Sequence, residues 1–275
     1  MMISGLGRSL VIFGALSILA ACGSQSSIDT PGAMPQAHHI RTASSYQVLH
    51  SFGGSGDGDN PSAGLVVCCN IEATLYGTTY GGGANCSQGG GCGTVFSVTT
   101  SGTESVLYSF KGSGDGSSPD AGLLNVNGTF YGTTYTGGAN EDGTVFSVTP
   151  SGTETVLYRF KGTPGDGANP IANLIHRKVR KGTLYGTTFF GGAHGDGTVF
   201  SVTTSGKETI LHSFGGSGDG SNPQAGLLNV DGTLYGTTYG GGANGDGTVF
   251  SVTTSGTETV RHSFGGSGDG AHPDA

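Results

Sequence analysis

The stretch LYGTTYGGGANGDGTVFSV, residues 234–252, decides the fold of this chain, because near copies of it occur at three other places. The copies lie at residues 75–98, 130–148 and 184–202. A sequence that repeats at a period of this size indicates supersecondary units that stack on their neighbours. The chain is therefore expected to build one domain from equivalent modules.

Each module contains four short segments in which apolar and polar residues alternate, as in half-buried β-strands. In the second module they are AGLLNV from Ala121, TFYGTTY, GTVFSVT and VLYRF from Val156. Two-residue turns such as Asn127-Gly128 favour hairpins, because these residues tolerate positive φ. Strict alternation in the last strand of the first module would place Val106, Tyr108 and Phe110 on one face.

Four antiparallel strands per module, repeated around an axis, predict an all-β fold: a β-propeller of four-stranded antiparallel blades. We expect four complete blades at about residues 63–110, 121–160, 171–214 and 224–264, within a repeat domain at 46–275. Residues 46–52 resemble a lone N-terminal outer strand, and the chain stops where a further blade would begin. We interpret this pattern as a truncated chain; the alternative is a compact four-bladed ring with a displaced terminal strand.

Composition supports a folded, acidic, glycine-rich protein. The chain has 275 residues, of which 56 are Gly and none is Trp, and its formal net charge is −8. Disordered glycine-rich segments lack Val, Tyr and Phe at fixed spacing. Here those residues recur in register, so the glycines are expected in turns. A chain with so few Lys and Arg lacks the positively charged surface that nucleic-acid binding requires, and we exclude nucleic acid as a partner.

The N-terminus predicts export and a lipid anchor. Residues 1–21 combine the positive charge of Arg8 with a short apolar stretch, as a signal peptide does. Leu19-Ala20-Ala21-Cys22 resembles the lipobox of bacterial lipoproteins, in which the Cys is acylated, and several acyl chains give stable anchoring. Residues 22–45, rich in Ser, Ala, Pro and Gln, are expected to be a flexible tether. The expected location is the bacterial cell envelope, at the cell surface or outer membrane, and the alternative is an ordinary cleaved signal peptide.

Four cysteines remain besides Cys22, and an exported protein can form disulfides. Cys86 and Cys92 flank a Ser-Gln-Gly-Gly-Gly insertion that the other modules lack, so we expect a small disulfide-closed loop there. Their spacing also fits half of a metal knuckle, but no second pair at matching spacing supports zinc. Cys68 and Cys69 are left as free, vicinally bonded or paired elsewhere.

The whole pattern LYGTT…GG…GTVFSV…G.ET.L..F, with its Gly-Asp-Gly…Pro spacer, resembles the GloVer (Gloeobacter–Verrucomicrobia) tandem repeat of bacterial surface proteins. The resemblance covers residues 46–275 in four full copies. The double glycines Gly137-Gly138 and Gly191-Gly192 are also similar to those of kelch blades, although the usual blade Trp is absent. The resemblance implies a propeller-like fold and an exported, surface-attached protein, and it implies no reaction.

If the protein binds a ligand, the face that carries the long loops is the better candidate, because loops on a rigid scaffold commonly carry binding sites. Strands alternate in direction, so the loop after strand four and the loop between strands two and three should emerge on one face. That face would collect nine aspartates, which are Asp57, Asp59, Asp115, Asp142, Asp166, Asp196, Asp219, Asp246 and Asp269. Each can instead support its own turn. The richest loop, with Asp57, Asp59 and Asn60, is the alternative calcium site.

No catalytic residues are assigned. The departures from the repeat are His194, the basic segment at residues 176–181 and the Cys86–Cys92 insertion, and none assembles a nucleophile, a base and an orienting partner. Glu104 and its copies Glu154, Glu208 and Glu258 recur before strand four, which does not match the paired carboxylates of a glycosidase. We expect neither a cofactor nor a resident metal.

The sequence thus favours a lipid-anchored, non-catalytic surface propeller that is attached to the membrane through its anchor and binds a protein or a glycan. One alternative is a glycan-active enzyme whose catalytic residues lie partly in missing blades. The other is a purely structural repeat protein of the envelope.

Overall fold

The computed structural model describes residues 46–53, 56–68, 74–84, 86, 91–177 and 182–274. The predicted signal peptide, Cys22 and the tether lie outside these residues, as do Cys69 and most of the basic segment. All regular secondary structure in the described part of the chain is β, which confirms the predicted fold class. Over the same residues, we find no helix with the length and hydropathy that a bilayer crossing needs.

Four antiparallel sheets of four strands follow one another along the chain and form the blades. Blade 1 consists of β2 (Val66–Val67), β3 (Thr74–Thr79), β5 (Thr94–Thr99) and β6 (Glu104–Ser109). Blade 2 consists of β7 (Leu124–Val126), β8 (Thr129–Thr134), β9 (Thr144–Val148) and β10 (Glu154–Arg159). Blade 3 consists of β12 (Ile175–His176), β13 (Thr183–Thr188), β15 (Thr198–Thr203) and β16 (Glu208–Ser213). Blade 4 consists of β18 (Leu228–Val230), β19 (Thr233–Thr238), β21 (Thr248–Thr253) and β22 (Glu258–Ser263).

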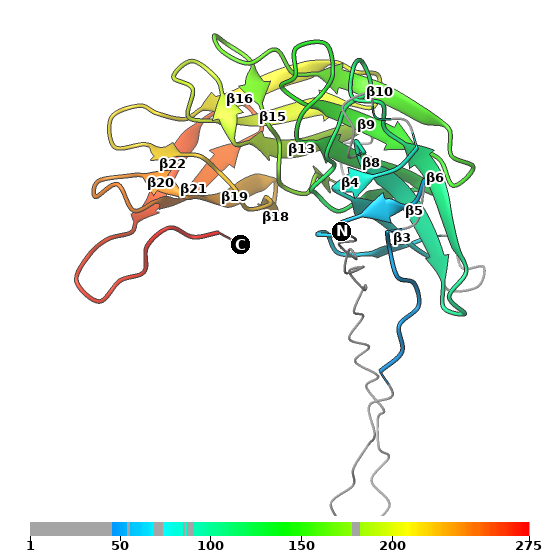
Figure 1. Ribbon diagram of the computed structural model, residues 1–275. Helices are drawn as coiled ribbons and strands as arrows, with labels where there is room; N and C mark the ends of the chain where they lie inside the picture. The colour runs from blue at the N-terminus through cyan, green and yellow to red at the C-terminus, as the bar shows by residue number, and fades with distance from the viewer. Residues whose placement is uncertain are drawn as a thin grey trace, which may run out of the picture.

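The blades fan along an arc, with the fourth strands β6, β10, β16 and β22 on its outer side (Figure 1). The short first strands lie on the inner side, where β2 contacts β7 and β7 contacts β12. The Asn125 side chain of β7 donates a 3.0 Å hydrogen bond to the carbonyl of Val67 in β2 and so joins two first strands. This radial order of strands is that of propeller blades.

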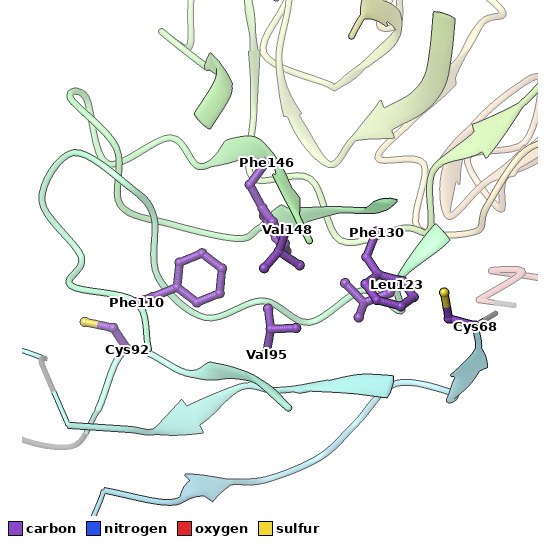
Figure 2. Close-up of a cluster of buried hydrophobic side chains, with 8 residues drawn as sticks. All are labelled: Cys68, Cys92, Val95, Phe110, Leu123, Phe130, Phe146 and Val148. Atoms are coloured by element: carbon purple, nitrogen blue, oxygen red, sulfur yellow. The ribbon is translucent and has the colours of Figure 1, made fainter. Parts of the chain in front are cut away.

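Neighbouring blades are held together by buried aromatic and aliphatic side chains. Figure 2 shows the cluster between blades 1 and 2, in which Val95 and Phe110 of the first blade face Leu123, Phe130 and Phe146 of the second. The Phe110 and Phe146 rings meet edge to face, with centroids 5.0 Å apart, a preferred geometry for aromatic pairs. The boundary of blades 2 and 3 and that of blades 3 and 4 repeat this pair as Phe160–Phe200 and Phe214–Phe250, and Phe52 of the N-terminal segment packs in the same way on Phe96 of blade 1.

Each fourth strand contains a β-bulge. In blade 1, Phe96 pairs with Val106 and the adjacent Val95 pairs with Tyr108, so Leu107 is the extra residue. Directly paired residues share a face, so Val106 and Tyr108 point to opposite faces, and the prediction from strict alternation is wrong. A bulge redirects the side chains that follow it. Here it aims the Tyr108 ring toward the loop that leads into blade 2.

The two-residue hairpins form as predicted. Asn127 and Gly128 have φ of 52° and 86°, and Asp231 and Gly232 have φ of 48° and 92°. Two successive positive φ angles define the turn type whose twist matches antiparallel strands.

The N-terminal segment at residues 46–52 requires a correction. Only Ser51 forms an isolated bridge there, and none of the sheets in the described part of the chain includes this segment. It nevertheless packs where a fourth strand would lie, because Phe52 is buried against Phe96 with ring centroids 4.8 Å apart. Apolar burial, and not a hydrogen-bonded ladder, places this segment.

Candidate functional site: the loop face and the blade boundaries

The two long loops of each module do emerge together, and we call this side of the molecule the loop face. The loop that enters a blade pairs with the loop between that blade's second and third strands in three small sheets. These are β1 (Gly58–Asp59) with β4 (Gly81–Gly82), β11 (Gly167–Ala168) with β14 (Phe190–Gly191), and β17 (Gly220–Ser221) with β20 (Gly240–Gly241). The two paired loops lie very close together: a Cβ on Gly191, which has φ of 83°, would lie 2.5 Å from the Asp166 carbonyl oxygen. Only glycine fits this position.

The aspartates of the Gly-Asp-Gly loops accept hydrogen bonds from groups of the fold; Asp115 and Asp166 are buried, Asp57 and Asp219 are half-buried, and Asp269 is exposed. In Asp166, Oδ1 accepts a 2.7 Å hydrogen bond from the Gly167 amide, and Oδ2 accepts 3.0 and 2.7 Å bonds from the Lys161 amide and the Tyr158 hydroxyl. Asp57, Asp115, Asp219 and Asp269 make the same kind of bond to the ring at the corresponding position of the preceding fourth strand. Asp115 and Asp166, which the sequence placed among the candidate ligand-binding carboxylates, are therefore buried, whereas Asp269 remains exposed.

A glutamate at the start of the next fourth strand completes a repeated cluster at each blade boundary. We call the three side chains, a ring, an aspartate and a glutamate, an inter-blade triad. The clearest example is His212, Asp219 and Glu258, which joins blade 3 to blade 4; its potential ligand atoms all lie within 4.8 Å of one another. His50, Asp57 and Glu104 form an equivalent group. A tyrosine takes the ring position in the other two triads, Tyr108–Asp115–Glu154 and Tyr158–Asp166–Glu208.

The triad glutamates occupy an unusual electrostatic position. Burial, followed by the negative charge of Asp115, raises the pKa of Glu154 to about 7. Burial and the charge of Asp166 raise the pKa of Glu208 to about 7 as well. Burial also raises the pKa of Glu104 and of Glu258. In all four glutamates, Oε1 is buried without a hydrogen-bond partner.

The remaining aspartates of the loop face lie closer to solvent. Asp59 is exposed, and Asp142, Asp196 and Asp246 are half-buried in the loops between the second and third strands. Asp59 follows Asp57 and Gly58 along β1, and the two oxygens of Asp57 already accept bonds from His50 and the Gly58 amide. The calcium alternative at Asp57, Asp59 and Asn60 would therefore need a carboxylate that the fold already uses.

The cysteine insertion lies beside a small polar hollow on the loop face. Cys86 and Cys92 form a disulfide. Cys68 is also disulfide-bonded, which excludes the free thiol for this residue. The hollow has a volume of about 230 Å³ and lies at the boundary between blades 1 and 2. Its lining includes both cysteines of the loop, the hydroxyl residues Ser113, Ser117 and Thr136, and Glu141.

Aromatic side chains surround the same loops. Tyr80, Phe190 and Tyr239 are 40%, 42% and 40% exposed, and each directly follows the second strand of its blade or lies one residue further on. Aromatic residues are enriched in binding interfaces because they present large, rigid contact area. The loop face therefore combines a polar hollow with exposed rings.

Among the residues that the structure describes, the other departures from the repeat do not assemble into a reactive group. His194 is exposed on its loop. His176 and Arg177 are the only described members of the basic segment, and the Arg177 guanidinium lies against Gly232. The repeated core hydroxyls are bonded to each other: Thr188 Oγ1 lies 2.8 Å from Thr198 Oγ1. These threonines serve the fold.

The triad glutamates recur before each fourth strand, but the contacts that they make were not predicted from the sequence. Their recurrence was visible, but the contact joins one blade's ring to the next blade's strand, more than forty residues along the chain. The signal that could have identified the triads is the joint recurrence of the His or Tyr ring, the Gly-Asp-Gly loop and the Glu.

Comparison with protein families identifies a match to the Gloeobacter/Verrucomicrobia repeat over residues 37–179 and 178–275. A comparison with curated protein sequences finds no match.

Several solved structures share a similar chain course at low identity. The computationally designed Ika8 protein is 20% identical, with 77% of this chain and 51% of that chain covered and a TM-score of 0.43. A candidate 6-phosphogluconolactonase from Bacteroides uniformis is 16% identical, with 77% and 58% covered and a TM-score of 0.45. An α-L-arabinofuranosidase from Clostridium thermocellum is 14% identical, with 74% and 72% covered and a TM-score of 0.41. The chain thus spans little more than half the length of the first two. Because all three TM-scores are below 0.5, the fold assignment rests on the sheets described above.

Proposed function

This chain belongs to the Gloeobacter/Verrucomicrobia repeat family, and from that premise we propose that it is a non-catalytic binding module of the bacterial cell envelope. The observation that carries the proposal is the loop face, where Tyr80, Phe190 and Tyr239 are exposed on a scaffold of rigid blades. Three exposed rings on tightly paired loops lose little conformational freedom on binding, which favours affinity.

Of the two ligand classes expected from the sequence, a glycan fits this face better than a protein does. The polar hollow offers the hydroxyls of Ser113, Ser117 and Thr136 and the carboxylate of Glu141 within about 230 Å³. Such groups can exchange hydrogen bonds with sugar hydroxyls, while exposed rings can cover the apolar face of a sugar. The hydroxyl and carboxylate groups in the lining of the hollow favour a hydrogen-bonding ligand over the apolar anchor of a protein interface.

The binding proposal is tested with the full chain in detergent on an array of bacterial envelope polysaccharides, followed by titration calorimetry on any glycan retained. The variant Y80A/F190A/Y239A should lose affinity by at least about tenfold, since each lost aromatic anchor removes on the order of 1 kcal/mol. The matched control is L228A/V230A, which removes exposed apolar side chains from β18, at the inner edge of blade 4. Equal binding by the triple variant, or cleavage of the bound glycan, would contradict the proposal.

The second part of the proposal concerns anchoring. Cys22 in the Leu19-Ala20-Ala21-Cys22 segment is the acylated residue, and the following tether holds the repeat domain at the membrane surface. In cell fractionation, the wild-type chain should sediment with membranes and incorporate labelled fatty acid. The C22A variant should do neither; labelled lipid on C22A would contradict the assignment.

A further inference from the structure

Two of the four inter-blade triads have a histidine at the ring position, and their chemistry differs from that of the tyrosine triads. His212 Nε2 lies 2.9 Å from Asp219 Oδ2, and His50 Nε2 lies 3.0 Å from Asp57 Oδ2. A neutral imidazole nitrogen has a lone pair that can bind a metal ion. At the same place a tyrosine hydroxyl donates a hydrogen bond to the aspartate, as Tyr158 does toward Asp166 at 2.7 Å.

The glutamate supplies the second, independent indication of a ligand. All four triad glutamates have a buried Oε1 without a hydrogen-bond partner, but only Glu104 and Glu258 share their cluster with a histidine nitrogen as well as an aspartate. A buried polar atom without a partner is unfavourable by about 1–3 kcal/mol, and more for a charged group. A cation between the three side chains would satisfy that oxygen.

The surroundings already orient the ligands of the His212 triad. The Gly220 amide donates a 2.7 Å hydrogen bond to Asp219 Oδ1, which leaves Oδ2 directed at the histidine. The His212 ring packs edge to face on Phe214, with centroids 4.8 Å apart. The side chains of His212 and Asp219 are 20% and 12% exposed, so the group lies mostly inside the blade boundary. Supporting contacts of this kind fix the orientation of metal ligands.

We propose that the His212–Asp219–Glu258 and His50–Asp57–Glu104 triads each bind a divalent transition-metal ion of the zinc class. The first ion would join blade 3 to blade 4, and the second would join the N-terminal segment to blade 1. One imidazole and two carboxylates are ligands that zinc accepts, with a further position open to water. Calcium is disfavoured, because it requires six to eight oxygen ligands. In the His212 triad the ion would connect the fourth strand of blade 3, the loop that follows it and the fourth strand of blade 4.

The chain contains its own matched controls. H50Y and H212Y install the residue that Tyr108 and Tyr158 already provide at equivalent positions, so both variants are expected to fold. Y158H does the reverse and creates a third His–Asp–Glu group with Asp166 and Glu208. His262 pairs with Asp269 at 2.8 Å, but no glutamate is grouped with this pair in the part of the chain that the structure describes. H262Y is therefore the negative control.

The experiment uses the full chain in detergent, stripped with a chelator and titrated with Co²⁺ and with Zn²⁺. All variants carry H38A/H39A, because adjacent histidines in the tether could bind metal on their own. We expect two ions per chain, a visible Co²⁺ absorption typical of low-coordinate sites and a higher unfolding temperature. H50Y and H212Y should each remove one ion, E258Q should weaken one site at least tenfold, Y158H should add an ion, and H262Y should change nothing.

Two results would overturn the proposal. One is an unchanged metal content in H50Y and H212Y, or no metal bound at micromolar concentration. The other is equal stabilisation by Ca²⁺ alone, which would assign the clusters to hard cations. Loop-face glycan binding is measured separately, so the failure of either proposal is recognisable without the other.

Discussion

Asp166 shows how a residue that resembles part of a binding surface can belong to the fold. Its carboxylate accepts three hydrogen bonds, from the Tyr158 hydroxyl and from the amides of Lys161 and Gly167. Hydrogen bonds to a charged group contribute about 1.5–3 kcal/mol each, and their loss leaves donors unpaired. The sequence predicted the turn role, because an Asp between two glycines commonly bonds its own backbone.

The first prediction concerns this aspartate. D166A should lower the free energy of unfolding by about 2 kcal/mol or more, because it leaves the Tyr158 hydroxyl and two amides without their acceptor. Urea denaturation monitored by tyrosine fluorescence measures the change. The control is D59A at the exposed Asp59, which should stay within about 0.5 kcal/mol of wild type. Equal effects of the two variants would contradict the structural role.

The second prediction concerns pH. Glu154 has its pKa raised to about 7 by burial and by Asp115, while Tyr108, Arg159 and Lys111 act in the opposite sense. The folded protein therefore holds a proton that the unfolded chain releases near the ordinary glutamate pKa of 4.5. Its contribution to stability is fully present below that value and is lost as the pH rises toward about 7. Glu208 acts in the same direction.

E154Q/E208Q should therefore flatten the decline in unfolding temperature between pH 5 and pH 8, and should be more stable than wild type at the upper end. Differential scanning fluorimetry across that range checks this. E141Q, at an exposed position of the loop face, is the control and should preserve the wild-type slope. A parallel slope in E154Q/E208Q would show that other groups cause the pH dependence.

At the scale of single elements, the second and third strands of each blade are joined at their loop ends by a buried threonine pair. Thr188 Oγ1 lies 2.8 Å from Thr198 Oγ1 and donates to the Phe190 carbonyl at 2.8 Å. Threonine is common in strands for its shape alone, so the sequence could not distinguish this hydrogen bond from simple strand preference.

T188V should lower the free energy of unfolding by about 1–3 kcal/mol, because it leaves the buried Thr198 hydroxyl and the Phe190 carbonyl without their partner. T198V should cost less, because the Thr188 hydroxyl still donates to the Phe190 carbonyl. The double variant should cost less than the sum, since both hydroxyls are removed together. Thermal or urea unfolding of the three variants completes the cycle. Strict additivity would mean that the two hydroxyls do not interact.

The β-bulge of the fourth strand is the local feature that the alternation of apolar and polar residues does not predict. In β5 the side chains follow simple alternation: Phe96 and Val98 lie in one core cluster and Val95 lies in another. The same rule failed in β6, because the extra residue Leu107 has no sequence signature that separates it from a regular strand residue. The missed bulge also hid the inter-blade triads, since it directs the ring of each fourth strand to the next blade.

At the scale of the whole molecule, the fold depends on the contact between successive blades. Phe160 is fully buried at the boundary of blades 2 and 3, with its ring centroid 5.1 Å from that of Phe200. F160A should lower the free energy of unfolding by about 3–5 kcal/mol, as deletion of a buried aromatic ring does. F190A, at an exposed ring, is the control. A small effect of F160A in urea unfolding would mean that the blades fold independently.

The radial architecture could be predicted because repeat period, hairpin turns and strand pattern all agree. The ligand could not, because the residues that distinguish the loop face, such as Thr136 and Glu141, form a hollow only after two blades come together. The triads could not be predicted from the sequence either, since Glu258 of blade 4 meets His212 of blade 3 across a blade boundary. In both cases the contacts that form the site join two modules, whereas the repeat pattern predicts only the strands and turns within one module.

The most direct test of the account measures whether the modules follow an arc. Ser101, Ser151, Ser205 and Ser255 are exposed at equivalent turns of the four blades, and spin labels can be attached there through unnatural amino acids that spare the native cysteines. Pulsed electron paramagnetic resonance then gives the distances between pairs. The account predicts a 101–255 distance well below the sum of the three neighbouring distances, whereas a distance equal to that sum would indicate a straight solenoid and contradict the propeller.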